Sequence, residues 1–404
     1  MSVWSHENLG DLCSLITDGK HGDCRNEDNS GYYFISCKDV KDGRINYEDA
    51  RQIVHGDFAE THRRTDLKPG DVLLTNSGTI GRLAIAPDDD KTPKTTFQKS
   101  VAILKPLPDM ITSHFLYYSL SADQNRLVNS AGGAAQKNLL LGELRRFSIR
   151  VPSLSVQNEI ASILSAYDDL IENNRRRIQL LEQAARLLYK EWFVHLRFPG
   201  HEHVKIKDGV PEGWEKGVVS DFYSTASGGT PSRKNPGFYT GVVPWVKTQE
   251  LTGGFILSTE ERITEEAIKL SSAKLLPRHT VLVAMYGATI GQTAILSVPA
   301  TTNQACCAVI PAALGTTYSH AYLFFNHFKM DLVGLRQGAA QKNISQQVIK
   351  AFKMVLPVKG LLDAFSESVS PFFDQIETLQ RLNFNLTKAR DLLLPRLMNG
   401  EVAV

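Results

Sequence analysis

The sequence predicts an α/β protein with a pseudo-two-fold internal repeat, in which two similar α/β globules are joined by two long antiparallel coiled-coil helices. Two observations carry this prediction. The hexapeptide Gly-Ala-Ala-Gln-Lys-Asn stands at 133–138 and again at 338–343, an offset of 205 in a chain of 404 residues. A segment with an apolar heptad pattern follows each copy. A long repeat of this kind indicates one structural unit used twice.

The repeat extends well beyond the hexapeptide. Segments 71–74, 95–98 and 115–118 match segments 280–283, 301–304 and 322–325, and the offset drifts only between about 205 and 211, as loop insertions would cause. Short β-type runs separated by Gly, Pro, Asn and Asp predict the two globules. The predicted domain limits are 1–152 for the first globule, 153–197 for a central helix, 198–357 for the second globule and 358–404 for a C-terminal helix.

The two helical segments carry matching heptad seams. The first has core positions Ile160, Leu164, Tyr167, Ile171, Asn174, Ile178, Leu181, Ala185, Leu188 and Trp192. At an offset of 205, nine of the ten counterparts are apolar or Asn, and the exception is Arg390. Helices related by a two-fold axis run antiparallel, and the register that brings their ends level sets Asn174 against Asn383. A buried Asn pair costs stability but fixes register. The alternative is two helices packed separately on their own globules.

Composition and motifs exclude several classes of protein. The net charge of +2 does not by itself indicate a nucleic-acid binder. The five cysteines form no CxxC pair, which favours reduced thiols and a cytoplasmic protein. No stretch approaches the ~18 apolar residues of a membrane span. Walker A, HExxH and GxSxG motifs are missing, so we expect no catalytic residue. His201-Glu-His203 is interpreted as a solvated linker rather than a metal site, and 235–238 as a turn.

Several segments resemble one known family. The second globule begins with Pro211-Glu-Gly-Trp214 and contains Gly228-Gly-Thr-Pro-Ser232 and Val243-Pro-Trp-Val246, and each globule ends with the hexapeptide, a short strand and a Pro. In this order, and with the duplication, they resemble the specificity (S) subunits of type I restriction–modification systems over essentially the full length. One departure is Leu361, which stands where the first helix has Gln157.

The resemblance implies a non-catalytic protein that binds double-stranded DNA. In that family each globule is a target-recognition domain for one half of a bipartite, asymmetric site, and the helices set the gap. The helices also dock two methyltransferase (M) subunits, and restriction (R) subunits complete the complex. No cofactor is then expected in this chain. S-adenosylmethionine, and ATP with Mg, are expected on the partner subunits. The complex is expected in a prokaryotic cytoplasm. The alternatives are a duplicated protein-interaction scaffold without a nucleic-acid role and a self-contained DNA methyltransferase.

Candidate DNA contacts are loop residues that can reach phosphates or base edges. In the first globule these are Lys20, His21, Lys38, Arg44, Arg63, Arg64, Asn76, Ser77, Lys94 and Lys99. In the second they are Ser232, Arg233, Lys234, Lys247, Gln249, Lys274, Arg278, Tyr286 and Asn303. The regions of Lys38 and Gln249, and of Lys20 and Ser232, rank highest because equivalent loops differ there in chemistry. 

Two further segments have open interpretations. The basic run 175–177 is interpreted as an exposed helix face, with a phosphate contact as the alternative. The hexapeptides are interpreted as tight junctions between globule and helix. Two roles remain open for them, either plain loop chemistry or docking of a methyltransferase subunit.

Overall fold

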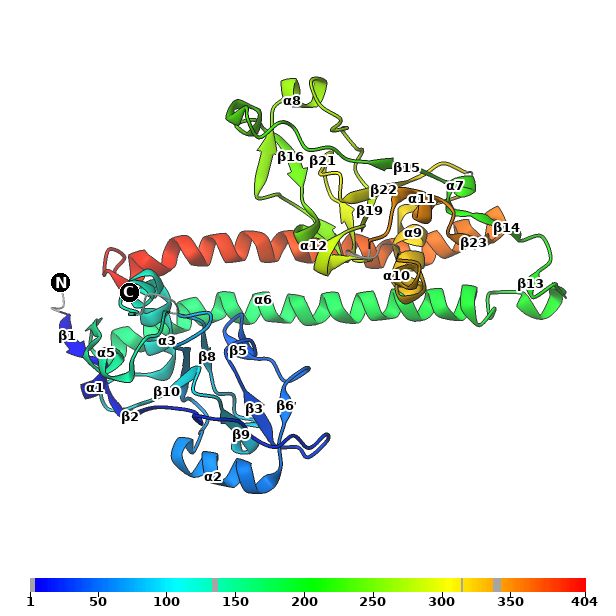
Figure 1. The fold of residues 1–404 in the computed structure, drawn as a ribbon. Helices are drawn as coiled ribbons and strands as arrows, with labels where there is room; N and C mark the ends of the chain where they lie inside the picture. The colour runs from blue at the N-terminus through cyan, green and yellow to red at the C-terminus, as the bar shows by residue number, and fades with distance from the viewer. Residues whose placement is uncertain (1–3, 133–136, 314, 337–342) are drawn as a thin grey trace. The chain divides into compact units, whose positions relative to one another are not determined.

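The computed structural model describes residues 4–132, 137–313, 315–336 and 343–404. The chain forms two compact units, unit 1 (Met1–Leu170 and Leu386–Val404) and unit 2 (Ile171–Asn385). Two long helices, α6 (Leu154–Tyr189) and α12 (Lys359–Met398), each contribute to both units. Each unit therefore combines one globule with a length of both helices (Figure 1).

The globule of unit 1 is built on two small sheets. A four-stranded antiparallel sheet has the order β2 (Cys13–Asp18), β10 (Val101–Pro106), β7 (Val72–Thr75) and β8 (Leu83–Ile85). A three-stranded sheet has β3 (Tyr33–Ile35) between β6 (Arg51–Gln52) and β9 (Thr95–Phe97), with β3 and β9 parallel. The hairpin β4 (Val40–Lys41) and β5 (Arg44–Ile45), and helix α2 (His55–Thr65), flank these sheets.

The globule of unit 2 repeats this topology. Its larger sheet has the order β15 (Tyr223–Ser227), β22 (Cys306–Pro311), β19 (Val281–Ala284), β20 (Thr293–Leu296) and an added β17 (Phe255–Ile256). Its smaller sheet has β16 (Val243–Val246) between β18 (Glu261–Ile263) and β21 (Thr301–Thr302), and the parallel pair is β16 with β21. The duplication seen in sequence is therefore a duplication of strand order, including which pair runs parallel.

Each globule is closed by a strand pair that leads into a long helix. In unit 1, β1 (Ser5–Asn8) pairs with β11 (Ser148–Val151). The short helices α1 (Leu9–Leu12), α4 (Gln124–Asn129) and α5 (Leu141–Arg146) lie between these two strands in the sequence. In unit 2, β14 (Glu215–Val218) pairs with β23 (Lys353–Leu356), with α7 (Val219–Phe222), α8 (Glu265–Lys269), α10 (Lys329–Gly334) and α11 (Gln346–Lys350) along the way. A short hairpin of β12 (Ile206–Lys207) and β13 (Val210–Pro211) precedes β14.

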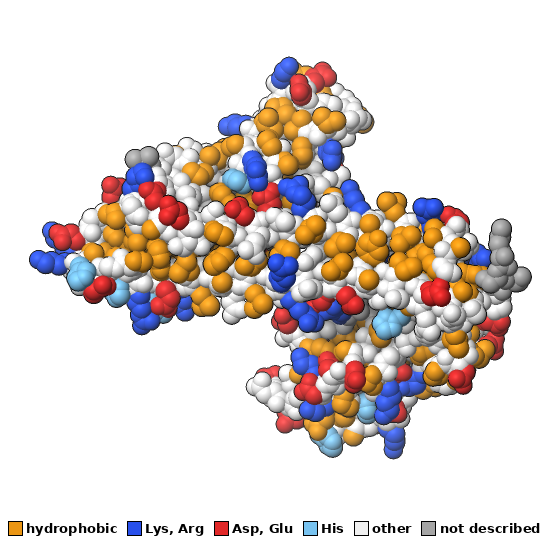
Figure 2. Space-filling view, turned by 180° about the vertical axis from the view of Figure 1, so that it is seen from behind, with side chains coloured by type: hydrophobic (Ala, Val, Ile, Leu, Met, Phe, Trp, Pro, Cys, Tyr) orange, Lys and Arg blue, Asp and Glu red, His pale blue; other side chains and the backbone are white. Residues whose placement is uncertain are grey.

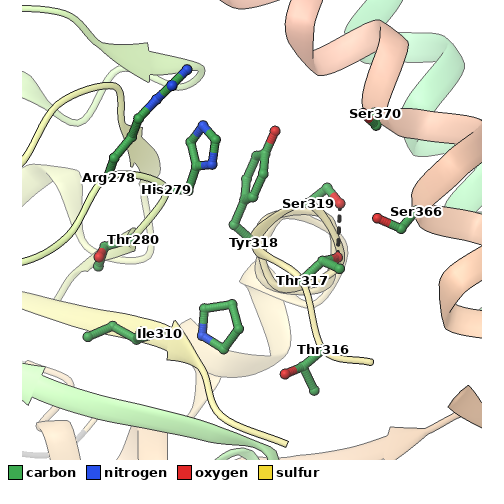
Figure 3. A pocket seen from close by; sticks show the side chains of 11 residues that line it. Arg278, His279, Thr280, Ile310, Thr316, Thr317, Tyr318, Ser319, Ser366 and Ser370 are labelled. Atoms are coloured by element: carbon green, nitrogen blue, oxygen red, sulfur yellow. Dashed lines mark hydrogen bonds between the residues drawn. The ribbon is translucent and has the colours of Figure 1, made fainter. Parts of the chain in front are cut away.

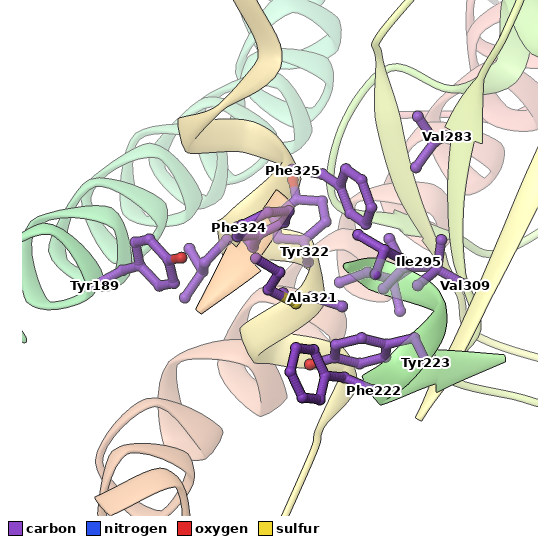
Figure 4. Packing of buried hydrophobic residues seen from close by; sticks show 14 of the residues in the cluster. Tyr189, Phe222, Tyr223, Val283, Ile295, Val309, Ala321, Tyr322, Phe324 and Phe325 are labelled. Atoms are coloured by element: carbon purple, nitrogen blue, oxygen red, sulfur yellow. The ribbon is translucent and has the colours of Figure 1, made fainter. Parts of the chain in front are cut away.

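One helix of each globule packs between the sheet and the long helices. In unit 2 this is α9 (Tyr318–His327), whose Phe325 lies beside Ile295 of the sheet (Figure 4) and whose Tyr322 meets Phe373 of α12 with ring centroids 5.8 Å apart. In unit 1 it is α3 (Ser113–Ala122), whose Phe115 and Leu116 share a core with the start of α6 and the end of α12. The hydrophobic core of each globule thus includes residues from both long helices, because burying their apolar seams removes large nonpolar areas from water.

The two long helices pack on each other antiparallel in the predicted register. In unit 2, Asn174 Nδ2 donates to Asn383 Oδ1 at 2.9 Å, and Trp192 meets Phe365 with ring centroids 5.5 Å apart. In unit 1, Ile160 of α6 and Leu397 of α12 are buried in one cluster. The alternative of helices packed separately is therefore wrong. The misfit Arg390 pairs with Asp168 of the facing helix.

Both long helices end at residues that terminate a helix. After α6, one π-helical turn (Lys190–Val194) and Leu196 at φ 59° end the helix before Phe198. Gly400 at φ 71° follows α12, a common helix-terminating conformation. Gln157 locks the start of α6 by accepting from Thr112 N at 2.9 Å and donating to Met110 O at 2.9 Å. Counting from the paired prolines 152 and 357, its counterpart is Leu362 rather than Leu361, so the expected correspondence was one residue off.

Candidate nucleic-acid interface

In unit 1, the ends of four strands converge on the segment 98–100. Lys99 N donates to Lys20 O at 3.0 Å, Gln98 N to Ile35 O at 2.8 Å, and Asn76 N to Ser100 O at 3.0 Å. This joins the loops after β2, β3 and β7 to the one before β10. We call residues 19–22, 36–38, 76–78 and 98–100 loop cluster 1. It brings together six predicted contacts, namely Lys20, His21, Lys38, Asn76, Ser77 and Lys99.

The cations of loop cluster 1 lie beside carboxylates. Lys20 Nζ donates to Glu60 at 3.1 Å, which raises the pKa of Lys20, and His21 Nε2 lies 3.1 Å from Asp18. Arg64 of α2 contacts the same Asp18 at 2.5 Å. Ion pairs with exposed members are weak, so a phosphate can replace the carboxylate as partner of these cations. Lys38 and Lys99 are exposed in the same cluster.

Unit 2 has an equivalent convergence. Gly229 N donates to Thr302 O at 2.9 Å, Asn303 N to Val246 O at 2.9 Å, and Met285 N to Ala305 O at 2.8 Å. We call residues 228–232, 246–249, 285–287 and 303–305 loop cluster 2. It contains the predicted contacts Ser232, Lys247, Gln249, Tyr286 and Asn303. Gln249 is exposed, and Tyr286 is 39% exposed.

Carboxylates also cover Lys247 in loop cluster 2 and Arg233 next to it. Arg233 makes a bidentate pair with Glu261 at 2.6 and 3.1 Å, while its guanidinium lies 4.0 Å from the Tyr239 ring centroid. Lys247 donates to Glu260 at 2.6 Å and to Glu261 at 3.0 Å. The hydrogen bond from Arg233 lowers the pKa of the Glu261 carboxyl. Glu261 therefore holds two predicted DNA-contacting cations in place.

Charges of both signs are interspersed on the surface. On the face drawn in Figure 2, Lys and Arg side chains occur in small groups with Asp and Glu among them. This agrees with the nearly balanced net charge of +2. The cationic positions, rather than an overall field, therefore define the candidate interface.

Other predicted residues of unit 1 lie around or away from loop cluster 1. Arg63 and Arg64 lie on α2 beside it, and Arg44 lies on the strand β5. Lys94 precedes β9, at the opposite end of that strand from Lys99. Asn76 is only 7% exposed, because the backbone of its loop is bonded on both sides, to Ser100 and Leu139. In this structure it does not present its amide to a ligand.

In unit 2, two predicted basic residues adjoin loop cluster 2 and another does not. Lys234 follows Arg233 in an exposed turn, and Lys274 comes directly after Ala273, which packs beneath Gly229. Arg278 instead donates to Glu377 of α12 at 2.8 Å. It lies with His279 and Tyr318 on a cleft of about 350 Å³, with Ser366 and Ser370 of α12 opposite (Figure 3). Arg278 is thus a contact between globule and helix.

Sequence reasoning missed two pairs of residues in the loop clusters. A Cβ on Gly19 would lie 2.0 Å from Phe97 O, and a Cβ on Gly228 would lie 2.1 Å from Thr302 Oγ1. Only glycine therefore fits at these two strand ends. Gln98 and Gln304 occupy equivalent positions, and Thr230 donates to Gln304 Oε1. The signal for the glutamines was present, since both end the repeated segments 95–98 and 301–304.

The remaining predicted segments give mixed outcomes. Arg176 pairs with Glu172 at 3.0 Å within α6, and Arg175 lines a groove that also includes Gln179, Gln380 and Phe384. Most of both hexapeptides lies outside the described residues. The last residue of the first copy, Asn138, forms bridges with Gly132 and Ser77, and α5 and β11 separate it from α6. Its neighbour in space is loop cluster 1, so the described end of the hexapeptide is not the junction to the helix.

Neither a metal cluster nor a membrane span is found in the described part of the chain. Its His, Cys, Asp and Glu side chains form no group of three or more that could hold a metal ion. Its helices include none that is both long and apolar enough to cross a bilayer.

The family of the chain follows from comparison with known proteins. The sequence profile of the Type I restriction modification DNA specificity domain matches residues 1–183 and 211–386, one match for each half of the repeat. The chain belongs to this family, whose members supply the DNA specificity of type I restriction–modification systems.

Individual relatives and one solved structure agree with this family. The MjaIX specificity subunit of Methanocaldococcus jannaschii is 28% identical and covers 83% of this chain and 78% of its own length. The HindI specificity subunit of Haemophilus influenzae is 23% identical and covers 100% of both chains. The type I restriction–modification S subunit from M. genitalium shares the fold, with a TM-score of 0.62 at 15% identity over 98% of this chain and 96% of that one.

Proposed function

We propose that loop cluster 1 reads one half of a split, asymmetric double-stranded DNA target and that loop cluster 2 reads the other half. One observation carries this proposal. The two globules share strand order and present equivalent loop clusters, yet the exposed side chains differ, with Lys38 and Lys99 in one and Gln249 and Tyr286 in the other. Equivalent scaffolds with different side chains suit two readers of different base sequences, because base edges are read by side chains.

The partners and chemistry of this proposal follow from the family. Two methyltransferase subunits dock on α6 and α12, restriction subunits join the full complex, and S-adenosylmethionine, ATP and Mg belong to those partners. The chain itself supplies specificity and no catalytic group. The support is the match of both halves to a specificity domain and the names of the relatives, which are specificity subunits.

A matched pair of lysines tests where the DNA lies. Lys99 belongs to loop cluster 1, while Lys94 is also exposed but lies at the other end of the same strand. We expect Lys99→Ala, in complex with the methyltransferase subunits, to weaken DNA binding and to reduce the slope of log affinity against log salt by about 1. Lys94→Ala is the control and should leave both unchanged. Equal effects of the two variants would place the DNA elsewhere.

The target itself comes from the methylation pattern. The chain is co-expressed with a cognate methyltransferase subunit, and modified adenines are mapped by single-molecule sequencing. We expect one motif with two short specified blocks around a fixed gap, and Gln249 variants should alter one block only. A soluble complex that produces no new modified motif would favour the interaction scaffold instead.

A further inference from the structure

Two amide side chains of loop cluster 2 have their oxygen atoms held by the protein. Asn303 Oδ1 accepts a hydrogen bond from Ala305 N at 3.1 Å, and Gln304 Oε1 accepts one from the hydroxyl of Thr230. A backbone N–H can only donate, so the atom of Asn303 that faces Ala305 is the oxygen. The Nδ2 of Asn303 and the Nε2 of Gln304 therefore lie on the side of each amide that faces away from its internal partner.

Both amide nitrogens are open to solvent. Within the described residues, neither Asn303 Nδ2 nor Gln304 Nε2 has a hydrogen-bond partner, and neither belongs to the polar atoms that are buried without one. Gln304 is exposed and Asn303 is half-buried. Loop cluster 2 thus presents N–H donors from two adjacent residues, while the oxygens of the same amides face the protein.

The residue before Thr230 is bonded through both its N–H and its carbonyl. Gly229 N donates to Thr302 O at 2.9 Å, and Trp245 Nε1 donates to Gly229 O at 2.9 Å. Trp245 is only 2% exposed, so this support is part of the core. The Thr230 hydroxyl, and through it the Gln304 amide, is therefore held in one orientation before a ligand arrives, and little conformational freedom is lost on binding.

Loop cluster 1 has no such pair of held amides among its described residues. The Gln98 side chain forms no hydrogen bond there, and Asn76 is only 7% exposed, with an Oδ1 that has no partner. The cluster exposes Lys38 and Lys99 instead, whose ammonium groups are cations on flexible stems rather than fixed donors. The donor pattern of Asn303 and Gln304 is therefore a property of globule 2.

We propose that Asn303 and Gln304 read a guanine in the half-site of globule 2, and that Thr230 positions Gln304 for this task. This inference rests on the proposed function. In the major groove guanine presents two acceptors, N7 and O6, whereas adenine and cytosine each present an N–H donor. An Asn or Gln that reads adenine uses its oxygen and nitrogen together, which these amides cannot do while their oxygens face Ala305 and Thr230. Thymine offers one acceptor beside a methyl group, so guanine is the base that satisfies both donors.

Substitutions that replace each outward nitrogen by oxygen test the two readers. Asn303→Asp and Gln304→Glu keep an oxygen toward Ala305 or Thr230 but turn the outward donor into an acceptor. Complexes with the methyltransferase subunits are titrated, at one salt concentration, with duplexes that carry each base in turn at every position of the mapped motif. The native complex should prefer guanine over adenine about tenfold or more at one position of one block, and either variant should lose this preference. Ratios between duplexes on the same complex cancel the general repulsion of phosphates by the added charge.

A base analogue identifies the atom that is read. 7-Deazaguanine has a carbon in place of N7 and still pairs with cytosine, so it removes one acceptor from the groove. At the guanine of the globule 2 block it should weaken binding by the native complex about tenfold, and binding by the double variant Asn303→Asp, Gln304→Glu less than about twofold. The control is the same analogue at a guanine of the other block, where native and variant complexes should respond alike.

A matched pair of variants tests Thr230. Thr230→Val keeps the shape of the side chain and removes the hydroxyl, so the Gln304 amide can turn, and adenine should be bound within about twofold of guanine. Thr230→Ser retains the hydroxyl and should retain the preference. A native preference for adenine, or a guanine preference that is unchanged in Thr230→Val or in the double variant, would overturn the inference and leave the proposed function standing. A native complex that methylates no split motif would refute the proposed function, and this inference with it.

Discussion

Asn174 of α6 and Asn383 of α12 form a hydrogen-bonded polar layer between two seams that are apolar at most of their other positions. Asn174 Nδ2 donates to Asn383 Oδ1 at 2.9 Å, and Asn383 Nδ2 donates to Ile171 O at 3.1 Å. Asn174 is only 8% exposed. Sliding one helix by a heptad would separate the two amides and leave each without its present partner, so this pair makes one register better than its neighbours.

The first prediction concerns this pair. Asn383→Leu leaves the Asn174 amide buried without its acceptor, and we expect a loss of about 1–3 kcal/mol in the free energy of unfolding. The double variant with Asn174→Leu should recover most of this loss, because both polar groups are gone. Urea unfolding followed by circular dichroism measures both. Asn385→Leu, on the exposed face of α12, is the control. A double variant less stable than the sum of the single ones would contradict the interpretation.

The second prediction is a loss of stability in mild acid. His320 is fully buried on α9, accepts from or donates to Tyr223 OH at 2.9 Å, and burial lowers its pKa to about 4 from an ordinary 6.5. The unfolded chain binds a proton at this histidine more readily than the folded chain does. The contribution of His320 to the free energy of unfolding is therefore fully present above pH 6.5 and is lost as the pH falls toward 4. The full loss is about 3 kcal/mol.

A variant separates His320 from the other titrating groups. His320→Asn keeps a hydrogen-bonding partner for Tyr223 but cannot be protonated, so its unfolding free energy should fall less between pH 7.5 and pH 5 than that of the native chain. His203→Asn, at an exposed residue, is the control. Identical pH dependence of the native and His320→Asn chains would show that this histidine is not responsible.

The third prediction concerns the carboxylate that holds Arg233 and Lys247. Glu261→Gln removes the negative charge from both cations, so we expect the complex with methyltransferase subunits to bind duplex DNA several-fold more tightly at low salt. The slope against salt should become steeper by about 1, since one more phosphate contact is made. Fluorescence anisotropy with a labelled duplex measures this. Glu265→Gln on the neighbouring α8 is the matched control, and weaker binding by Glu261→Gln would argue against Arg233 and Lys247 as phosphate contacts.

The fourth prediction tests the helices as the element that sets the gap. Four residues are inserted in α6 between Leu170 and Ile171, and four in α12 between Asn385 and Leu386, where the two units meet in sequence. Each helix grows by about 6 Å, and the antiparallel register is kept on both sides. The methylated motif should gain one or two base pairs in its gap while both specified blocks stay the same. An unchanged gap would show that the helices do not set it, and an insertion in α6 alone should abolish methylation.

The sequence was sufficient for the features that depend on local spacing. Heptads place side chains on one face whatever the rest of the chain does, so the antiparallel pairing and the Asn174–Asn383 contact followed from counting. The fold class followed from the repeat. The long-range partners did not follow. Arg390 looked like a defect in the seam because its acceptor, Asp168, lies 222 residues away.

The candidate interface was predictable only in part, for the same reason. Arg278 carries the right charge in a loop, but its partner Glu377 is 99 residues away and directs it to α12. Asn76 has the right chemistry, but the segments 98–100 and 137–139 close over its loop. The convergence of loop cluster 1 depends on the parallel pairing of β3 with β9, which a period-two pattern in the sequence cannot distinguish from an antiparallel pair.

The composition of unit 1 from both ends of the chain has a consequence for synthesis. Leu397 and Met398 are buried with Phe115, Ile160 and Leu164 in its core. While the ribosome is still making the second half of the chain, the first globule has an incomplete hydrophobic core and an exposed apolar seam at the start of α6. Unit 2 is continuous in sequence and can close as soon as residue 385 has emerged. The half that is translated first is therefore the last to complete its core, because Leu397 and Met398 can be buried only after the end of α12 has been made.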